Sequence, residues 1–177
     1  MIALFHGVSL TSRLIRWFNW GVYSHAAWCR EDGGSYEAWR GISRGDRQAK
    51  VRFGTLGANH TPGTRIDLFD VSGLTTINKI VIERFLHSQL GKPYDWMGIV
   101  HFVTRRPEYP SGQEKWFCSE LVAAACAHGG VPLFRELPAY KISPSMLACS
   151  PLLQYRRTCF AGMPSPLPTV KPQEALS

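Results

Sequence analysis

An alanine-rich stretch that follows two aromatic residues constrains the fold of this chain most. It begins Trp-Phe-Cys-Ser-Glu-Leu-Val at residue 116 and continues through three consecutive alanines to Gly129 and Gly130. Alanine favours helix, and glycine supplies the left-handed residue that commonly ends one, so we expect a short apolar helix closed at Gly129. Cys118 would lie in its first turn, where the helix dipole stabilises thiolate over thiol. A nucleophilic cysteine needs that environment.

A predicted β-hairpin carries the two groups that would complete a thiol site. The runs 21–29 and 35–39 have strand-like composition, and the Asp-Gly between them is a strong hairpin signal. The first run contains His25 and the second contains Glu37. Thiol, imidazole and orienting acid are the parts of a cysteine hydrolase triad. A two-residue turn would place His25 and Glu37 on opposite faces, so this interpretation predicts an odd-length loop or a bulge at Gly34.

The order of these motifs resembles the circularly permuted NlpC/P60 group of papain-like proteins, and within it the YaeF/YiiX-type cysteine hydrolases. The resemblance rests on Tyr-Ser-His-Ala-Ala around His25, Tyr-Glu-Ala around Glu37 and Phe-Cys-Ser-Glu-Leu around Cys118, with supporting segments at 91–96 and 142–145. It implies a papain-like α+β fold, in which an antiparallel sheet or small barrel packs against helices and the nucleophile begins a helix. Residue by residue, it implies that Cys118 is the nucleophile, His25 the base and Glu37 the residue that orients the imidazole.

The same resemblance implies a hydrolase that cleaves an amide or peptide bond through a thioester. By analogy, the substrate would be a peptide or a peptidoglycan fragment of the bacterial cell wall. One alternative is a lipid-directed esterase, amidase or acyltransferase of the same superfamily, although the Asn-Cys-Glu-His motif of its acyltransferase branch is absent. The other alternative is a non-catalytic module that binds an anionic polymer. No cofactor is expected.

Each candidate residue also has a structural interpretation. Cys118 alone could be a buried small hydrophobe, and His25 alone a core histidine with satisfied hydrogen bonds. Tyr94 and Asp95 could contact substrate or an oxyanion, or could be a core residue and a helix cap. Tyr23 could line a substrate groove or contact an oxyanion, or could pack in the core. Glu37 needs a partner in either case, because a carboxylate on a half-buried strand is costly without one.

Motifs for metal and phosphate sites are missing from the sequence. It has no Cys-x-x-Cys, no His-Glu-x-x-His and no histidine pair at helical spacing, so we expect no metal site. The glycine-rich segment 41–45 lacks the lysine of a P-loop. The formal net charge of +7 favours anionic partners, but the basic residues form no run long enough for a nucleic-acid arm. We therefore expect no specific nucleic-acid binding.

The length of 177 residues and a hydrophobic content of 45% predict one packed domain over residues 1–160, followed by a proline-rich flexible tail over 161–177. No signal peptide or spanning apolar stretch is visible, so we expect a cytoplasmic protein without a transmembrane segment, with phage-type release or another export route left open. The 5 cysteines suit free thiols better than a disulfide framework in that setting.

The remaining elements are predicted from periodicity and capping residues. We expect strands at 2–5, 49–53, 65–70 and 154–157. We expect helices at 9–20, 75–90 and 95–103, the second ending before Gly91. A short helix should begin at Ser143-Pro144, with the proline in its first turn.

Overall fold

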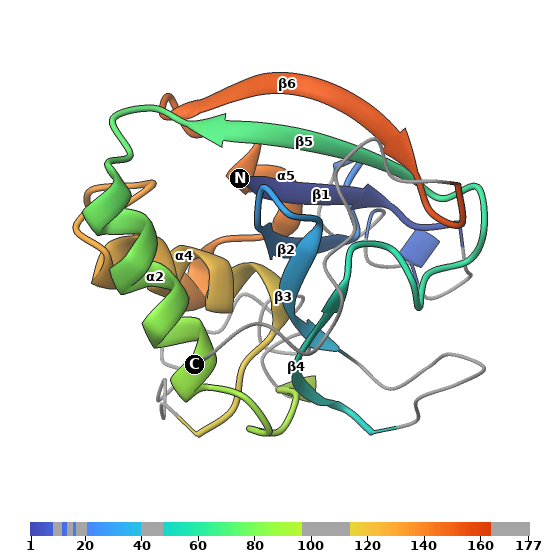
Figure 1. Cartoon of the computed structure of the whole chain (residues 1–177), viewed down its shortest axis with the longest axis horizontal. Helices are drawn as coiled ribbons and strands as arrows, with labels where there is room; N and C mark the ends of the chain where they lie inside the picture. The colour runs from blue at the N-terminus through green and yellow to red at the C-terminus, as the bar shows by residue number, and fades with distance from the viewer. Residues whose placement is uncertain (9–11, 14–15, 17–20, 40–47, 97–113, 164–177) are drawn as a thin grey trace.

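The computed structural model describes residues 1–8, 12–13, 16, 21–39, 48–96 and 114–163. Within them, six strands form one antiparallel sheet in the order β4-β3-β2-β1-β5-β6, and helices pack with it, so the α+β class is confirmed. The strands are β1 (Ile2–His6), β2 (His25–Cys29), β3 (Gly34–Trp39), β4 (Lys50–Thr55), β5 (Arg65–Val71) and β6 (Leu153–Phe160). The helices are α2 (Thr76–Ser88), α4 (Cys118–His128), α5 (Pro144–Leu147) and the short 3-10 helix η1 (Ala139–Lys141). Figure 1 shows α2 and α4 beside one another, with β5 and β6 arching along the top of the sheet.

Both faces of the central strand β1 are buried. Ile2 and Leu4 belong to a large core that includes residues of α2 and α4. Ala3 and Phe5 belong to a second, smaller core shared with β5. Because successive strand residues point to opposite faces, β1 separates these two cores. The same alternation decides on which side of the sheet each polar side chain of the neighbouring strands lies.

The predicted helix over 75–90 is confirmed as α2. Thr75 caps it, since its side chain accepts from the backbone N–H of Asn78 while Asn78 Oδ1 accepts from the backbone N–H of Thr75. Gly91 follows the helix with a φ of 84°. Among the other predictions, the short helix is confirmed as α5, where Ser143 Oγ accepts from the N–H of Met146 at 3.1 Å.

The predicted end of α4 at Gly129 is confirmed, because the helix stops at His128 and Gly129 is its C-cap, but the prediction that Gly129 is left-handed is wrong. Gly129 has a φ of −75°, and the left-handed residue is Gly130, with a φ of 80°. Gly129 is required for a different reason, because a Cβ at this position would lie 2.4 Å from Cγ1 of Ile82 in α2. The glycine therefore permits close contact between α2 and α4, and the turn follows it.

The four strands predicted outside the hairpin are confirmed as β1, β4, β5 and β6, with bounds that agree to within three residues. The helices predicted at 9–20 and 95–103 lie mostly outside the described residues, and so does the tail predicted over 161–177. Ala161 is described, and it is buried against the loop before β5, where its N–H donates to the carbonyl of Thr64. None of the described helices is long and apolar enough to span a bilayer.

Candidate active site

The turn between β2 and β3 sets the relative positions of His25 and Glu37. The strands pair Cys29 with Ser35, and the N–H of Arg30 donates to the carbonyl of Gly34 at 2.8 Å. This leaves a three-residue loop, 31–33, whose last residue, Gly33, has a φ of 86°. The predicted odd-length loop is confirmed. Continuing this register puts Glu37 opposite residue 27 and on the same face as His25. The side chains meet, and His25 Nε2 lies 2.7 Å from Glu37 Oε2.

The thiol of Cys118 forms a hydrogen bond with the same imidazole. Cys118 is the first residue of α4, a helix that packs against β2 and β3, and it is only 4% exposed. Burial would raise the pKa of this thiol, but the charge and hydrogen bond of His25 and the backbone N–H groups of Ala26 and Ser119 lower it. Because Nε2 of His25 faces Glu37, Nδ1 is the ring nitrogen left for the sulfur.

The pKa of His25 is raised to about 9. Burial alone would lower it, but the Cys118 thiolate and then Glu37 raise it by their charges and hydrogen bonds. The shifts of thiol and imidazole therefore favour the same state, a thiolate beside an imidazolium. The structure brings together the three residues that the sequence singled out, in the order sulfur, ring and carboxylate.

Two further residues hold Glu37, and sequence reasoning missed both. Arg52 lies directly opposite Glu37 on β4, and its Nε and Nη2 donate to Glu37 Oε1 at 3.0 and 2.7 Å. His60, from the loop between β4 and β5, places Nε2 at 3.3 Å from Glu37 Oε2. Burial would raise the pKa of Glu37, but His25 and His60 bring it well below its usual value. Glu37 is thus an ionised carboxylate with both oxygens engaged.

Aromatic rings enclose this carboxylate. The His60 ring stacks on Phe5 at 4.1 Å between centroids, and the Arg52 guanidinium lies 4.0 Å from the ring of Trp39. Trp39 also meets the His60 ring nearly edge-on at 5.1 Å. Burial lowers the pKa of His60, so its imidazole is neutral at pH 7. The charges that remain are a thiolate, an imidazolium, a carboxylate and a guanidinium, and they add to zero.

Tyr94 and Asp95 are buried beside the segment that leads into α4. The backbone N–H of Asp95 donates to the carbonyl of Trp116 at 2.9 Å, and the Tyr94 ring contacts Trp96 at 5.2 Å. Asp95 also helps to raise the pKa of Glu120 to about 7, after the larger effect of burial. Both residues therefore pack next to α4, while the helix that Asp95 was expected to cap lies mostly outside the described residues.

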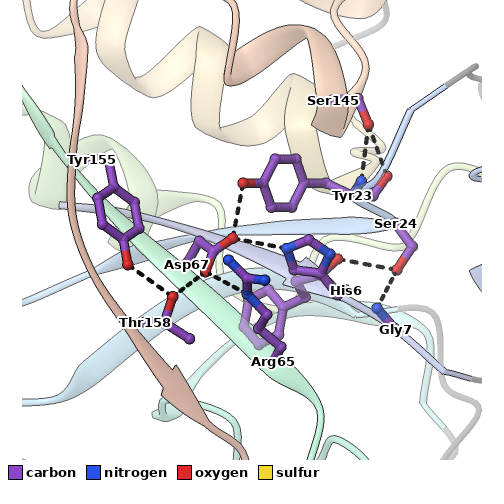
Figure 2. A network of polar contacts seen from close by, with 10 residues as sticks. His6, Gly7, Tyr23, Ser24, Arg65, Asp67, Ser145, Tyr155 and Thr158 are labelled. Atoms are coloured by element: carbon purple, nitrogen blue, oxygen red, sulfur yellow. Dashed lines mark hydrogen bonds and ion pairs between the residues drawn. The ribbon is translucent and has the colours of Figure 1, made fainter.

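Tyr23 lies in a different polar network, shown in Figure 2. Its hydroxyl donates to Asp67 Oδ2 at 2.9 Å, and its backbone N–H donates to Ser145 Oγ at 3.0 Å. Burial and Asp67 raise the pKa of the hydroxyl. Among the described residues, neither polar partner of Tyr23 belongs to the thiol site, so the structure does not place this hydroxyl with Cys118. The hydroxyl proton is donated to Asp67, and a role of Tyr23 in binding substrate or an oxyanion stays a prediction.

Asp67 is the centre of that network. Besides Tyr23 it accepts hydrogen bonds from His6 on β1, Arg65 on β5 and Thr158 on β6 (Figure 2). These donors outweigh burial and lower its pKa to about 2. The network therefore joins three strands to the chain segment that enters β2.

Three potential metal ligands meet at Glu37, although the sequence contained no metal motif. The imidazole nitrogens of His25 and His60 and a carboxylate oxygen of Glu37 all lie within 4.8 Å of one another. They come from two strands and a loop, so no local spacing could reveal them. The sequence predicted no metal site, but among the described residues these three side chains could together hold a metal ion.

Comparison with solved structures gives a likeness of fold, while the other comparisons find no match. No protein-family model matches the chain, and no curated protein matches it. A crystal structure described as the metalloprotein YiiX from Escherichia coli O157:H7 has a TM-score of 0.57 and is 15% identical. The match covers 88% of this chain and 94% of that one. At this identity the likeness establishes a shared fold over most of both chains.

Proposed function

We propose that this protein is a thiol-dependent hydrolase that cleaves an amide or peptide bond through a thioester. One observation carries the proposal: the His25 ring lies 2.7 Å from Glu37 and also forms a hydrogen bond with the Cys118 thiol. A nucleophile hydrogen-bonded to a base that is itself oriented by an acid is the arrangement that nucleophilic catalysis requires. The shared fold with a YiiX structure is consistent with the YaeF/YiiX-type group that the motifs resemble.

In the acylation step, the Cys118 thiolate attacks the substrate carbonyl carbon. The backbone N–H of Cys118, at the start of α4, would donate to the oxyanion that develops. The imidazolium of His25 then gives its Nδ1 proton to the leaving nitrogen, the C–N bond breaks and a thioester remains. Neutral imidazole next takes a proton from water as the oxygen adds to the thioester. Loss of the acid product restores thiolate and imidazolium.

Glu37 supports these steps without touching substrate. Its bond to Nε2 of His25 fixes the ring so that Nδ1 faces the sulfur, and its charge stabilises the imidazolium. Arg52 holds the other carboxylate oxygen, which keeps Glu37 ionised and limits its rotation. This division of roles explains why a buried acid is retained beside a buried base.

The substrate is assigned by class. The motif resemblance points to cell-wall peptides, so we propose an amide bond of a peptidoglycan fragment as the target. A panel of muropeptides and a panel of lipid esters and amides should be incubated with wild type and with Cys118→Ala. Cleavage of muropeptides by wild type alone supports the proposal. Release of fatty acid, with muropeptides intact, would instead identify the lipid-directed enzyme.

The reactivity of the thiol can be tested without knowing the substrate. Iodoacetamide labelling at about pH 6.5, read by mass spectrometry for each cysteine, should modify Cys118 faster than the exposed Cys149, which serves as the internal reference. His25→Ala should abolish that advantage. Labelling of Cys118 that is slower than that of Cys149, or unaffected by His25→Ala, would contradict a hydrolase and favour a binding module.

A metal-dependent hydrolase is the second candidate, favoured by the cluster of His25, Glu37 and His60. Two imidazoles and a carboxylate are ligands that zinc accepts, but ligand atoms around a tetrahedral zinc lie about 3.4 Å apart. The 2.7 Å from His25 Nε2 to Glu37 Oε2 is a hydrogen-bond length, and Arg52 occupies the other oxygen. Activity that EDTA removes and Cys118→Ser retains would favour the metal enzyme; the reverse pattern favours the thiol enzyme.

A further inference from the structure

The loop between β4 and β5 delivers a second imidazole to the acid of the proposed thiol site. His60 and His25 both direct Nε2 at the same oxygen of Glu37, at 3.3 and 2.7 Å. Arg52 takes the other oxygen with two hydrogen bonds. A carboxylate accepts about four hydrogen bonds, so the lone pairs of Glu37 are almost fully used.

We propose that His60 is a positioning residue, whose Nε2–H fixes the plane of the Glu37 carboxylate so that the carboxylate can aim the His25 ring at Cys118. This inference rests on the proposed thiol hydrolase. With Arg52 alone, the carboxylate would be anchored at one oxygen and free to tilt about that anchor. A donor to Oε2 from a direction other than that of His25 removes this freedom.

The loop that carries His60 is itself held firmly against the sheet. Gly57 begins the turn with a φ of 76°, and the N–H of His60 donates to its carbonyl at 3.0 Å. A Cβ at residue 57 would lie 3.0 Å from Cδ1 of Ile66, so the turn packs directly on β5. Asn59, with its amide oxygen facing Arg52, accepts from both terminal nitrogens at 3.1 and 3.2 Å. One turn therefore supports both the acid and its guanidinium partner.

A packing role is the rival explanation, because the His60 ring stacks on Phe5 at 4.1 Å and meets Trp39. Two substitutions separate the roles. His60→Gln keeps a donor at the position of Nε2 and removes the ring. His60→Phe keeps a ring that can stack on Phe5 and removes the donor. A positioning role predicts that Gln preserves function better than Phe, and a packing role predicts the opposite order.

The readout is the iodoacetamide labelling rate of Cys118, relative to exposed Cys149 in the same molecule, at about pH 6.5 in the presence of EDTA. EDTA removes any metal at Glu37, so a change reports on the hydrogen bond. We expect His60→Gln within about threefold of wild type and His60→Phe at least about tenfold slower. Thermal unfolding midpoints and circular dichroism establish that each variant is folded.

Three outcomes would overturn the assignment: His60→Phe at the wild-type rate, His60→Phe faster than a folded His60→Gln, or equal losses in both variants. If His60→Gln fails to fold, a wild-type labelling rate in His60→Phe would still overturn the assignment. Failure of the hydrolase proposal has a separate signature, because His25→Ala would then leave the labelling of Cys118 unchanged. A purely positional role also predicts that kcat falls and KM stays within about twofold once a substrate is known.

Discussion

Replacing the sulfur of Cys118 by oxygen would test whether thiol and imidazole form one ionised pair. Cys118 supplies the two largest effects that raise the pKa of His25, ahead of both effects of Glu37, while burial acts against them. The net change from 6.5 to about 9 corresponds to roughly 3 kcal/mol in favour of the imidazolium. A serine hydroxyl stays neutral in this pH range, so Cys118→Ser removes the partner charge and leaves the burial.

We therefore expect the pKa of His25 in Cys118→Ser to fall by at least about 2, to about 7 or below. Proton NMR of the histidine Cε1 resonances between about pH 5 and pH 10 measures it, and His25→Gln identifies the resonance. Cys149→Ser is the matched control, because it removes an exposed thiol and should leave the titration unchanged.

A His25 resonance that still titrates near pH 9 in Cys118→Ser would refute the reasoning. Glu37 would then be the main cause of the raised pKa of His25. The ion pair would consist of His25 and Glu37, and the thiol would only lie next to it. A fall to about 7 that also occurs in Cys149→Ser would point to a general loss of structure. The labelling experiment and this titration are independent, since one follows the sulfur and the other the ring.

The remaining predictions concern stability. The pKa of Glu120 is raised to about 7 by burial and by a neighbouring carboxylate, so its contribution to the free energy of unfolding is present below about pH 4.5 and is lost as pH rises through 7. Glu120→Gln should reduce this pH-dependent loss of stability by up to about 3 kcal/mol, measured by urea unfolding at several pH values. An unchanged loss of stability in the variant would contradict the prediction. Gly57→Ala should lower the thermal unfolding midpoint more than Gly63→Ala, because both glycines have positive φ but only the Cβ at residue 57 would meet a buried side chain. Equal decreases in the midpoint would show that packing at residue 57 is unimportant. Tyr23→Phe should lower the free energy of unfolding by about 1.5–3 kcal/mol, because the hydrogen bond to the buried carboxylate of Asp67 is lost. The labelling rate of Cys118 should stay within twofold of wild type, and a large decrease would indicate that Tyr23 supports the thiol site.

The hairpin that carries His25 and Glu37 could be predicted because its information is local. Asp-Gly marks the turn, and the requirement that two side chains share a face determines whether the loop is odd or even. The start of α2 could be predicted for the same reason, since a threonine cap acts on a backbone N–H only three residues away. Features that depend on neighbours within one turn leave a direct mark on the sequence.

Arg52 and His60 could not be predicted, because both reach Glu37 through tertiary structure. Arg52 is the direct cross-strand partner of Glu37, which becomes visible only when the register of β3 and β4 is known. The connection between these strands is ten residues long, and its glycines do not determine which residues of the two strands pair. Gly129 shows the same limit: its place at a helix end was readable, but its contact with Ile82 depends on how α2 crosses α4.

The four charges of the site, Glu37 included, add to zero, and this determines which substitutions the site can accept. Removing one member of a buried, hydrogen-bonded ion pair leaves an uncompensated charge and typically costs about 3–5 kcal/mol, whereas exchanging both partners for apolar residues of similar volume is often tolerated. Arg52 and Glu37 should therefore be varied jointly in any library directed at this site. Screens that alter them one at a time would discard viable combinations, because every intermediate on the route carries an unbalanced ion inside the protein.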